Sequence, residues 1–401
     1  MFYNLNRSKG VVRMFLSRMK LLIIGVLLVV FTSVSTALMV FSSFPGGIYG
    51  ADRLWKGMRT VSGNYYEAVD DNKLVDGALQ GMVKALGDPY SAYMNEKAYT
   101  DFQTSMKGSF SGVGMTLGMK DSSLIVVAPI EGTPSARAGV KSGDVIRKIN
   151  GEDTENFTVE DAVTRIRGEA GTSVNLVLDR KDKDGKISQV EVSLMRENIV
   201  VPSVYGKMLK DDVGYIRLTQ FGEHTTDDFR EKLQELDGQG MKRLVLDLRN
   251  NGGGLLNSAV DITGLLLKEG DVVSTIGRDG NKQISRSGGK TDRYQKLVVL
   301  INEGSASASE IVAGAIQDRK GGTLVGVKSF GKGSVQIVYP LDEQQKTAIR
   351  LTIAKYFTPS GRSIHGIGLE PDVLIQWGGE GPPFEIETDP QLKKAMEVLQ
   401  R

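Results

Sequence analysis

The pattern of apolar and polar residues changes several times along the chain. Residues 21–51 carry no charge, and the apolar part, 21–44, is long enough to cross a hydrocarbon core of about 30 Å. Residues 73–86 place apolar side chains at helical spacing up to a stop at Gly87-Asp88-Pro89, and a second helix is expected over 97–106. These patterns predict a membrane-crossing helix followed by a helical region.

The middle of the chain has the pattern of a β-rich domain with short helices. Strands are expected at 124–130, 144–149, 174–178 and 190–194, and helices at 134–138 and 159–167. Thr158 and Asp161 have the spacing of a capping box at the start of the second helix.

From residue 213 to 373 apolar strands alternate with amphipathic helices. Helices are expected at 226–236, 256–267 and 308–318, and strands at 214–218, 243–248, 297–301, 323–327, 335–339 and 348–357. This alternation is typical of an α/β domain. A Gly/Pro-rich linker at 378–383 and a last helix at 390–400 complete the expected elements.

The fold class expected from these elements is multidomain α+β. The predicted parts are a cytoplasmic tail and transmembrane anchor (1–50), a helical region (51–107), a β-rich domain (108–196), an α/β domain (197–376) and a C-terminal linker and helix (377–401). The helical N-terminal and C-terminal regions offer surfaces for a homodimer.

Charges around the apolar run predict its orientation. Asp52 is the first acidic residue after the run, and the basic residues before it are Arg7, Lys9, Arg13, Arg18 and Lys20. This asymmetry places the N-terminus in the cytoplasm and the rest of a single-pass membrane protein outside. A cleaved signal peptide with Ser35-Thr36-Ala37 as its small-residue site is the alternative, and the length of the run favours the uncleaved anchor.

The composition of the chain excludes several kinds of functional site. The net charge of +2, from 50 basic and 48 acidic residues, gives no bulk attraction to nucleic acid. The chain has no cysteine, which excludes disulfides, thiol nucleophiles and cysteine-bound zinc. Only His224 and His365 could serve as a histidine base, and a histidine-rich metal site is excluded, so neither a metal nor a cofactor is expected.

Three segments at strand ends carry candidate chemistry, and the first contains Ser305, Ser307 and Ser309. Ser307 and Glu310 have capping-box spacing ahead of a helix, which is the structural interpretation. A serine at a strand-to-helix turn also presents its hydroxyl above a sheet, where helix-end N–H groups can stabilise an oxyanion.

The second segment contains Lys332 between two glycines. Residues 326–332 fit the first part of a phosphate-binding loop, but Gly333 stands where Ser or Thr should follow, and a strand comes next instead of a helix. On that strand Lys332, Ser334 and Gln336 are expected to share one face. Lys332 is either a solvated surface lysine or, where burial lowers its pKa, a general base.

The third segment is the glycine loop Gly252–Gly254 after the strand that ends near Asp247. Backbone N–H groups of such a loop can bind an anion or an oxyanion. The G-x-G-x-x-G spacing of a dinucleotide site is absent.

Together these segments resemble the C-terminal processing peptidases, also called tail-specific proteases. The resemblance covers nearly the whole chain after the anchor and rests on GALQGMVKALGDPYSAYM (77–94), GTPSARAGVKSGDVIRKING (132–151), DLRNNGGGLL (247–256), SASASEIVAGAIQD (305–318), FGKGSVQ (330–336) and TPSGRSI…GIGLEPDV (358–373). It implies an α/β serine endopeptidase with a Ser–Lys dyad, no cofactor and a PDZ domain over 108–196.

The resemblance also implies roles for single residues. Ser307 would be the nucleophile, Lys332 the general base and Gln336 the residue that orients the lysine. Gly253 and Ala308 would donate the oxyanion hydrogen bonds. Ser334 stands where the family often has threonine.

In the PDZ region, Gly112, Val113 and Gly114 would receive the terminal carboxylate of a protein substrate while its tail adds a β-strand. Arg167 is a candidate reporter of the occupied groove, or simply a solvated arginine. A PDZ scaffold with a silent α/β domain is the competing function, and the intact Ser307, Lys332 and Gln336 argue against it.

Overall fold

The computed structural model describes residues 3–43, 45–120, 123–181, 185–290, 293–294, 296–342, 346–376 and 386–400. The predicted linker at 378–383 lies outside the described residues. The chain divides into two compact units, Met1–Gly87 and Asp88–Arg401.

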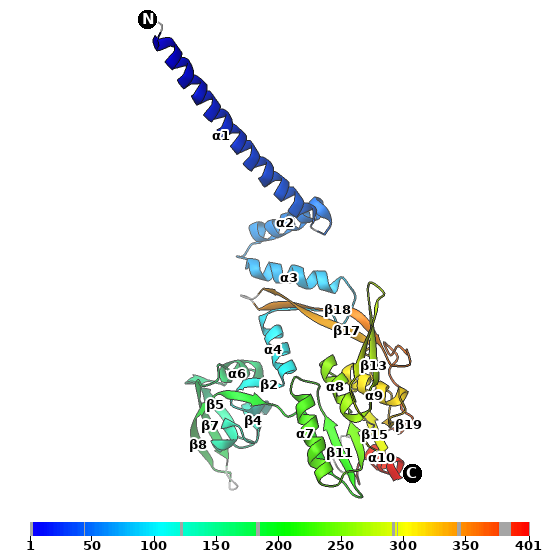
Figure 1. The fold of residues 1–401 in the computed structure, drawn as a ribbon. Helices are drawn as coiled ribbons and strands as arrows, with labels where there is room; N and C mark the ends of the chain where they lie inside the picture. The colour runs from blue at the N-terminus through cyan, green and yellow to red at the C-terminus, as the bar shows by residue number, and fades with distance from the viewer. Residues whose placement is uncertain are drawn as a thin grey trace. The chain divides into compact units, whose positions relative to one another are not determined.

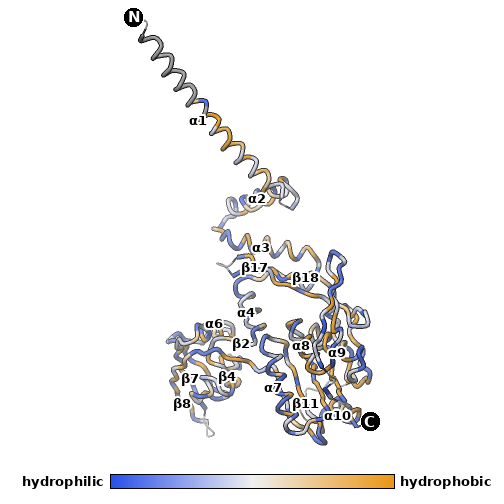
Figure 2. Tube along the Cα trace, in the orientation of Figure 1, coloured by the Kyte–Doolittle hydropathy of each residue, from blue (hydrophilic) through white to orange (hydrophobic). Residues whose placement is uncertain are grey.

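The first unit is helical, as the sequence predicts. It contains α1 (Tyr3–Ser42), α2 (Gly47–Asn64) and α3 (Asp71–Lys84), shown in blue in Figure 1. Within α1, Leu22–Val40 is long and apolar enough to cross a membrane and is exposed in the structure, and Figure 2 shows its hydrophobic colouring. The Asp70 side chain caps α3 by accepting from the Asn72 N–H.

The second unit begins with a short strand and a helix. β1 (Ala92–Met94) was not expected from the sequence, whereas α4 (Glu96–Lys107) confirms the predicted second helix. Asn95 caps α4 by accepting from the Ala98 N–H, and Gly108 ends it in a left-handed conformation.

A β-rich domain follows α4, as predicted. Its central sheet has the order β3-β4-β5-β7-β8, with β6 beside β5, and β2 pairs with β9 where the chain enters and leaves the domain. The strands are β2 (Ser109–Gly112), β3 (Met115–Lys120), β4 (Ser123–Pro129), β5 (Val145–Ile149), β6 (Glu152–Asp153), β7 (Ser173–Lys181), β8 (Ile187–Met195) and β9 (Glu197–Val200).

Two helices cover this sheet, α5 (Pro134–Arg137) and α6 (Val159–Ile166). The expected capping box starts α6, since Asp161 N–H donates to Thr158 Oγ1 and Thr158 N–H donates to Asp161. The core consists of alternate strand residues packed under the helices, among them Leu124, Val126, Ile146, Leu176 and Leu178.

The α/β domain is built on a mostly parallel sheet with the order β10-β11-β12-β15-β16-β19. Only the pairing of β10 with β11 is antiparallel among the described strands of this sheet. The strands are β10 (Val204–Met208), β11 (Val213–Leu218), β12 (Arg243–Asp247), β15 (Lys296–Ile301), β16 (Thr323–Gly326) and β19 (Val373–Leu374).

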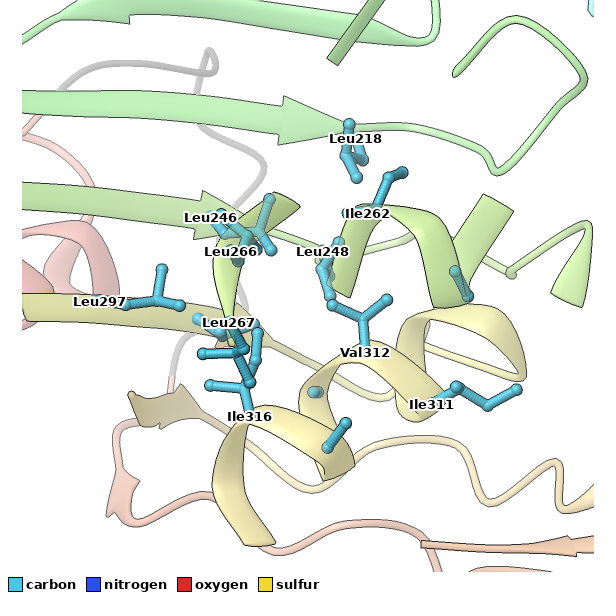
Figure 3. Packing of buried hydrophobic residues seen from close by; sticks show 14 of the residues in the cluster. Leu218, Leu246, Leu248, Ile262, Leu266, Leu267, Leu297, Ile311, Val312 and Ile316 are labelled. Carbon is cyan, nitrogen blue, oxygen red and sulfur yellow. The ribbon is translucent and has the colours of Figure 1, made fainter. Parts of the chain in front are cut away.

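Helices cover both faces of this sheet. Along β12 and just beyond it, Leu244, Leu246 and Leu248 pack against α7 (Thr225–Gly238), α8 (Leu256–Leu266) and α9 (Ala308–Asp318), as Figure 3 shows for the last two helices. Val245 faces the other way and packs against α10 (Pro390–Gln400). The apolar face of α10 is thus occupied by its own sheet, and the homodimer stays a prediction.

The domain contains a second sheet, which the sequence pattern did not distinguish from the parallel one. Its order is β1-β18-β13-β14, and β17 pairs with β18. It contains β13 (Gly270–Gly277), β14 (Lys282–Ser287), β17 (Ser334–Asp342) and β18 (Thr347–Phe357). The predicted strands at 335–339 and 348–357 therefore exist, but they form an antiparallel hairpin and do not belong to the parallel sheet.

Candidate active site

A cavity of about 480 Å³ brings the three chemistry-bearing segments together. The glycine loop, Ser307 and the segment from Lys332 to Gln336 all contribute to its lining. The cavity is lined by Phe102, Ser105, Met106, Thr219, Gln220, Gly252, Gly253, Gly254, Leu255, Leu256, Ser307, Ile311, Lys332, Ser334, Val335, Gln336, Val338, Arg350 and Tyr356.

Ser307 occupies the turn between β15 and α9 in a strained backbone conformation. Its φ of 55° and ψ of −114° are unusual for a residue with a side chain and cost on the order of 1–3 kcal/mol. Such strain persists only where the surroundings fix the backbone. The turn sets Ser307 at the N-terminal end of α9, where unpaired N–H groups favour negative charge.

The buried Glu310 carboxylate fixes this turn to the loop that carries the lysine. One of its oxygens accepts from the backbone N–H groups of Ser307 and Lys332, each at 2.9 Å. The other accepts from Ser329 Oγ at 2.5 Å and from Gly331 N–H at 2.7 Å. The sequence identified Glu310 only as half of a capping box, because its contacts to Ser329–Lys332 join segments that are far apart in the chain.

The neighbouring serines fix the same turn to the glycine loop. Ser305 Oγ donates to Leu248 O and Ser309 Oγ donates to Asn251 O, both at 2.8 Å. Ala306 N–H donates to the same Asn251 carbonyl at 3.0 Å. Both serines therefore hold the Ser307 turn against the glycine loop.

Gly253 lies directly against the Ser307 turn. A Cβ built on it would lie 2.8 Å from Ser307 Cβ and 2.9 Å from Ala308 N, so this approach requires glycine, as does its φ of 99°. A Cβ on Gly252 would meet nothing within 4 Å. The Gly253 N–H already donates to Asn251 Oδ1 at 2.9 Å, whereas the Ala308 N–H is the first in its helix.

Lys332 is half-buried, and its Nζ lies 5.1 Å from the centre of the Tyr90 ring. Burial lowers the pKa of Lys332, the positive charge of Arg350 lowers it further, and the carboxylates of Asp88 and Glu310 oppose the shift. Among the described residues no ion pair holds Lys332, and no hydrogen bond joins its Nζ to Ser307 Oγ.

Gln336 also lines the cavity but has other partners. Its Nε2 donates to Ser334 Oγ at 2.8 Å and to Thr352 Oγ1 at 3.2 Å. The structure therefore brings Gln336 to the same cavity as Lys332 while its amide group is engaged with β17 and β18.

Lys332, Ser334 and Gln336 all line the cavity, as expected for residues that share one face of a strand. Val335 lines the cavity as well, next to a shift of the β17–β18 register between Val335 and Gln336. Ile337 and Tyr339, which also lie on β17, are exposed.

Helix α4 supplies an apolar wall that the sequence analysis missed. Phe102, Ser105 and Met106 line the cavity. The helix is held there by the loop after β11, since Gln220 Nε2 donates to Ser105 O and Glu223 N–H donates to Met106 O at 3.1 Å. The sequence assigned this helix only to packing or dimer contact, because its side chains carry no recognisable motif.

The expected peptide groove lies between β3 and α6. Among the described strands β3 pairs only with β4, which leaves its other edge next to α6 available to an added strand. Val113 and Gly114 connect β2 to β3, whereas Gly112 is already paired with Glu197 in β9. Gly114 has a φ of 73°, and a Cβ there would lie 2.4 Å from Thr133.

Arg167 ends α6 and points toward α4. Its guanidinium lies 3.4 Å from Asp101 and 5.2 Å from the centre of the Phe110 ring. The next residue of α4, Phe102, lines the cavity. The groove helix and the wall of the cavity are therefore in contact through this partly exposed pair.

The two histidines lie outside the lining of the cavity. His224 directly precedes α7 and lines a separate small cavity. His365 packs beside Gly333, with its ring 6.3 Å from that of Tyr90.

Comparisons with known proteins define the class to which this fold and site belong. The description of peptidase family S41 matches residues 212–375, a PDZ domain matches 125–180, and the N-terminal domain of the activating protease CtpB matches 49–98. The β-rich domain is therefore a PDZ domain, and the α/β domain is a peptidase domain.

Individual relatives specify the family. The carboxy-terminal-processing protease of Bartonella bacilliformis is 42% identical over 323 residues, covering 79% of this chain and 73% of the relative. CtpA of Bacillus subtilis is 35% identical over 326 residues, covering 81% and 69%. The structure of the photosystem II D1 C-terminal processing protease matches at a TM-score of 0.50 and 28% identity, covering 87% of this chain and 96% of that one. The chain belongs to the carboxy-terminal processing proteases of peptidase family S41.

Proposed function

We propose that this protein is a serine endopeptidase that binds the C-terminal tail of a protein substrate in its PDZ domain and cleaves the substrate with Ser307 and Lys332. The observation that carries the proposal is the shared cavity. A serine at a strained helix-start turn and a lysine of lowered pKa line it together, next to the glycine loop.

In the proposed reaction, neutral Lys332 accepts the proton of Ser307 Oγ while the oxygen attacks the scissile carbonyl carbon. The resulting oxyanion accepts hydrogen bonds from the N–H groups of Ala308 and Gly253. The C–N bond then breaks, the Lys332 ammonium gives its proton to the leaving amine, and Ser307 remains as an ester. A water molecule, deprotonated by Lys332, hydrolyses the ester and restores the hydroxyl.

The structure corresponds to a resting arrangement in this proposal. Lys332 Nζ must leave the face of Tyr90 to reach Ser307 Oγ, and the Gln336 amide must turn from Ser334 to orient the amine. The Gly253 N–H must likewise share its bond to Asn251 with the oxyanion.

Substrate recognition is proposed for the groove between β3 and α6. The tail adds a strand to the free edge of β3, and the backbone N–H groups around Gly112, Val113 and Gly114 receive its carboxylate. Arg167 then reports the bound tail, because it contacts Asp101 on the helix that also lines the cavity.

We further propose that α1 anchors the protein in the cell membrane, with the N-terminus in the cytoplasm and the catalytic part outside. The length of the apolar stretch Leu22–Val40 and the basic residues before it support this placement. Protein that stays with membranes after carbonate washing and retains its N-terminal residues is the expected result. Soluble protein beginning near residue 38 would contradict it.

The activity itself is tested with a quenched fluorescent peptide that ends in an apolar residue, offered with a free or an amidated C-terminus. Wild-type protein should cleave the free form faster, and Ser307→Ala should cleave neither. Equal cleavage of both forms would remove the PDZ groove from the mechanism. A wild-type protein that binds the peptide without cutting it would favour the scaffold function.

A further inference from the structure

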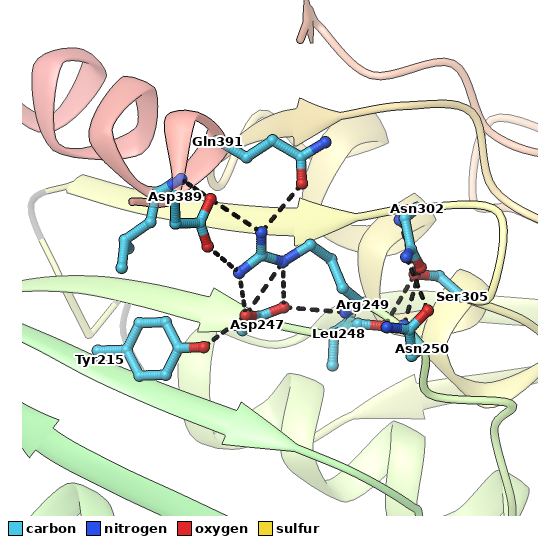
Figure 4. A network of polar contacts seen from close by, with 10 residues as sticks. Tyr215, Asp247, Leu248, Arg249, Asn250, Asn302, Ser305, Asp389 and Gln391 are labelled. Atoms are coloured by element: carbon cyan, nitrogen blue, oxygen red, sulfur yellow. Dashed lines mark hydrogen bonds and ion pairs between the residues drawn. The ribbon is translucent and has the colours of Figure 1, made fainter. Parts of the chain in front are cut away.

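The C-terminal helix α10 reaches the loop that leads into the cavity through a single buried arginine. Arg249 follows β12, and its guanidinium lies between Asp247 and Asp389, as Figure 4 shows. It contacts Asp247 at 2.6 Å, and Asp389, the residue before α10, at 2.8 Å. It also donates to Gln391 Oε1 at 3.0 Å.

This cluster is closed to solvent. The side chains of Arg249, Asp247 and Asp389 are only 9%, 3% and 5% exposed. Gln391 Nε2 donates to Ile375 O at 2.8 Å, which ties the start of α10 to the end of the sheet. Removing one partner of a buried ion pair leaves an uncompensated charge, so such a cluster holds one geometry strongly.

Further hydrogen bonds fix the chain on its way from Arg249 to the glycine loop. The Arg249 N–H donates to Asp247 Oδ1 at 3.0 Å, which fixes the turn after β12. Two residues later, Asn251 Nδ2 donates to Leu218 O and its Oδ1 accepts from the Gly253 N–H, both at 2.9 Å. Three residues therefore separate the arginine from the proposed oxyanion donor, and two of them, Asn250 and Asn251, are held by hydrogen bonds.

We propose that Asp389 is a positioning residue for peptide cleavage: from the start of α10 it holds Arg249, and through Arg249 the loop that presents the Gly253 N–H to the cavity. This inference rests on the proposed function, since it assumes that the loop binds the oxyanion. It makes the docked C-terminal helix a part of the catalytic apparatus, although α10 contributes no residue to the lining of the cavity.

Asp389 also caps α10, and the test must distinguish this role from its contact with Arg249. Its Oδ1 accepts from the Leu392 N–H at 2.9 Å and so caps α10. Asp389→Ser keeps a good capping residue but removes the carboxylate from Arg249. Asp389→Glu keeps a carboxylate within reach of Arg249 but caps less well. Met396→Ala, further along the buried face of α10, loosens the helix without touching the cluster.

The experiment measures kcat and KM for the quenched peptide and the Ki of a peptide aldehyde, whose adduct with Ser307 carries the oxyanion. Loss of one oxyanion donor lowers kcat about 10²–10³-fold, so a displaced donor in Asp389→Ser should lower it about 10–100-fold. KM should change little, Ki should rise with the loss of kcat/KM, and Asp389→Glu should recover most of the activity.

A purely structural role gives a different result. Fewer folded molecules would lower the apparent kcat and leave the Ki of the remaining ones unchanged, as expected for Met396→Ala. An unchanged Ki in Asp389→Ser, or activity equal to wild type, overturns the inference while Ser307→Ala still establishes the protease. If wild type and Ser307→Ala behave alike, the proposed function fails and takes the inference with it.

Discussion

The two halves of the candidate active site differ in how completely they are assembled. The nucleophile half, named after the proposed role of Ser307, consists of the Ser307 turn and the glycine loop. The Ser305 and Ser309 hydroxyls donate hydrogen bonds that fix it, and the Glu310 carboxylate accepts another. In the base half, the Lys332 backbone is fixed by Glu310, but its amine rests on Tyr90 and Gln336 bonds elsewhere.

This difference indicates where control of activity would act. A strained turn persists only because the surrounding hydrogen bonds fix it, so the Ser307 turn is costly to rearrange. Side-chain rotations of a lysine and a glutamine are small by comparison. A substrate signal therefore acts mainly on the base half, beside the hairpin of β17 and β18 and the wall formed by α4, while in the other half only the Gly253 N–H has to share its bond.

The largest expected effect comes from Lys332→Arg. Guanidinium stays protonated at neutral pH and cannot accept the Ser307 proton, although the charge is retained. Loss of general-base catalysis should lower kcat about 10²–10⁴-fold, measured with the quenched peptide.

His224→Ala and His365→Ala serve as matched controls and should leave the chemistry largely intact. A near-normal rate in Lys332→Arg together with an inactive His224→Ala would refute the Ser–Lys assignment and require a histidine base.

The second prediction concerns Glu310, the residue that joins the two halves. In Glu310→Gln, one carboxylate oxygen is replaced by an NH₂ group, which cannot accept a hydrogen bond. Depending on the orientation of the amide, the NH₂ group faces either the N–H groups of Ser307 and Lys332 or the donors of Ser329 and Gly331. Buried unsatisfied groups cost about 1–3 kcal/mol each. We expect the free energy of unfolding to fall by about 2–4 kcal/mol and kcat to fall with it.

The exposed Glu303, in the loop before Ser305, provides the matched control. Glu303→Gln should change neither the thermal midpoint nor kcat. If the free energy of unfolding of Glu310→Gln falls by no more than the contribution of a helix cap, roughly 1 kcal/mol, Glu310 does not join the two halves.

The sequence predicted the elements of each domain well, because their signals are local. The capping box of Thr158 and Asp161, and the helix of 308–318, appear where the periodicity placed them. The separate antiparallel sheet of β17 and β18 was not predicted, because pairing partners are set by contacts that a period of two does not encode. The shift after Val335 was invisible for the same reason.

The residues of the site divide in a similar way. Ser307, Lys332, Gln336 and the glycine loop stand in recognisable motifs, and the structure brings them to one cavity. Phe102 and Met106 have no motif and could not be found, since only the docking of α4 on the loop after β11 brings them there. The spacing of Asp389 from Arg249, 140 residues in the chain, likewise hid their ion pair.

The third prediction tests the looser half directly through Gln336→Glu. A carboxylate in place of the amide stabilises the ammonium form of Lys332, so the pH–rate profile should move to higher pH. At neutral pH the rate should fall, and raising the pH should restore much of it. Thr352→Val, which removes one present partner of Gln336, is the control and should leave the profile in place. A profile that Gln336→Glu does not move would show that the glutamine never approaches the lysine.

The smallest expected effect is on stability and concerns Lys332 alone. Burial lowers its pKa in the folded protein below the ordinary 10.5. Below the folded pKa both states carry the proton and the folded protein bears the full cost of the buried charge. Between the folded pKa and 10.5 only the unfolded chain holds the proton, so stability from this group rises with pH across that window.

Lys332→Met removes this group, and wild type should therefore gain thermal stability relative to the variant as the pH rises toward 10.5. The measurement is the difference between the two thermal midpoints over a series of pH values, in detergent. Lys282→Met, at an exposed position, supplies the background slope. A constant difference between wild type and Lys332→Met would mean that Lys332 titrates alike in both states. Burial would then not prepare it to act as a base, and the two halves of the site would have to be brought together by some other means.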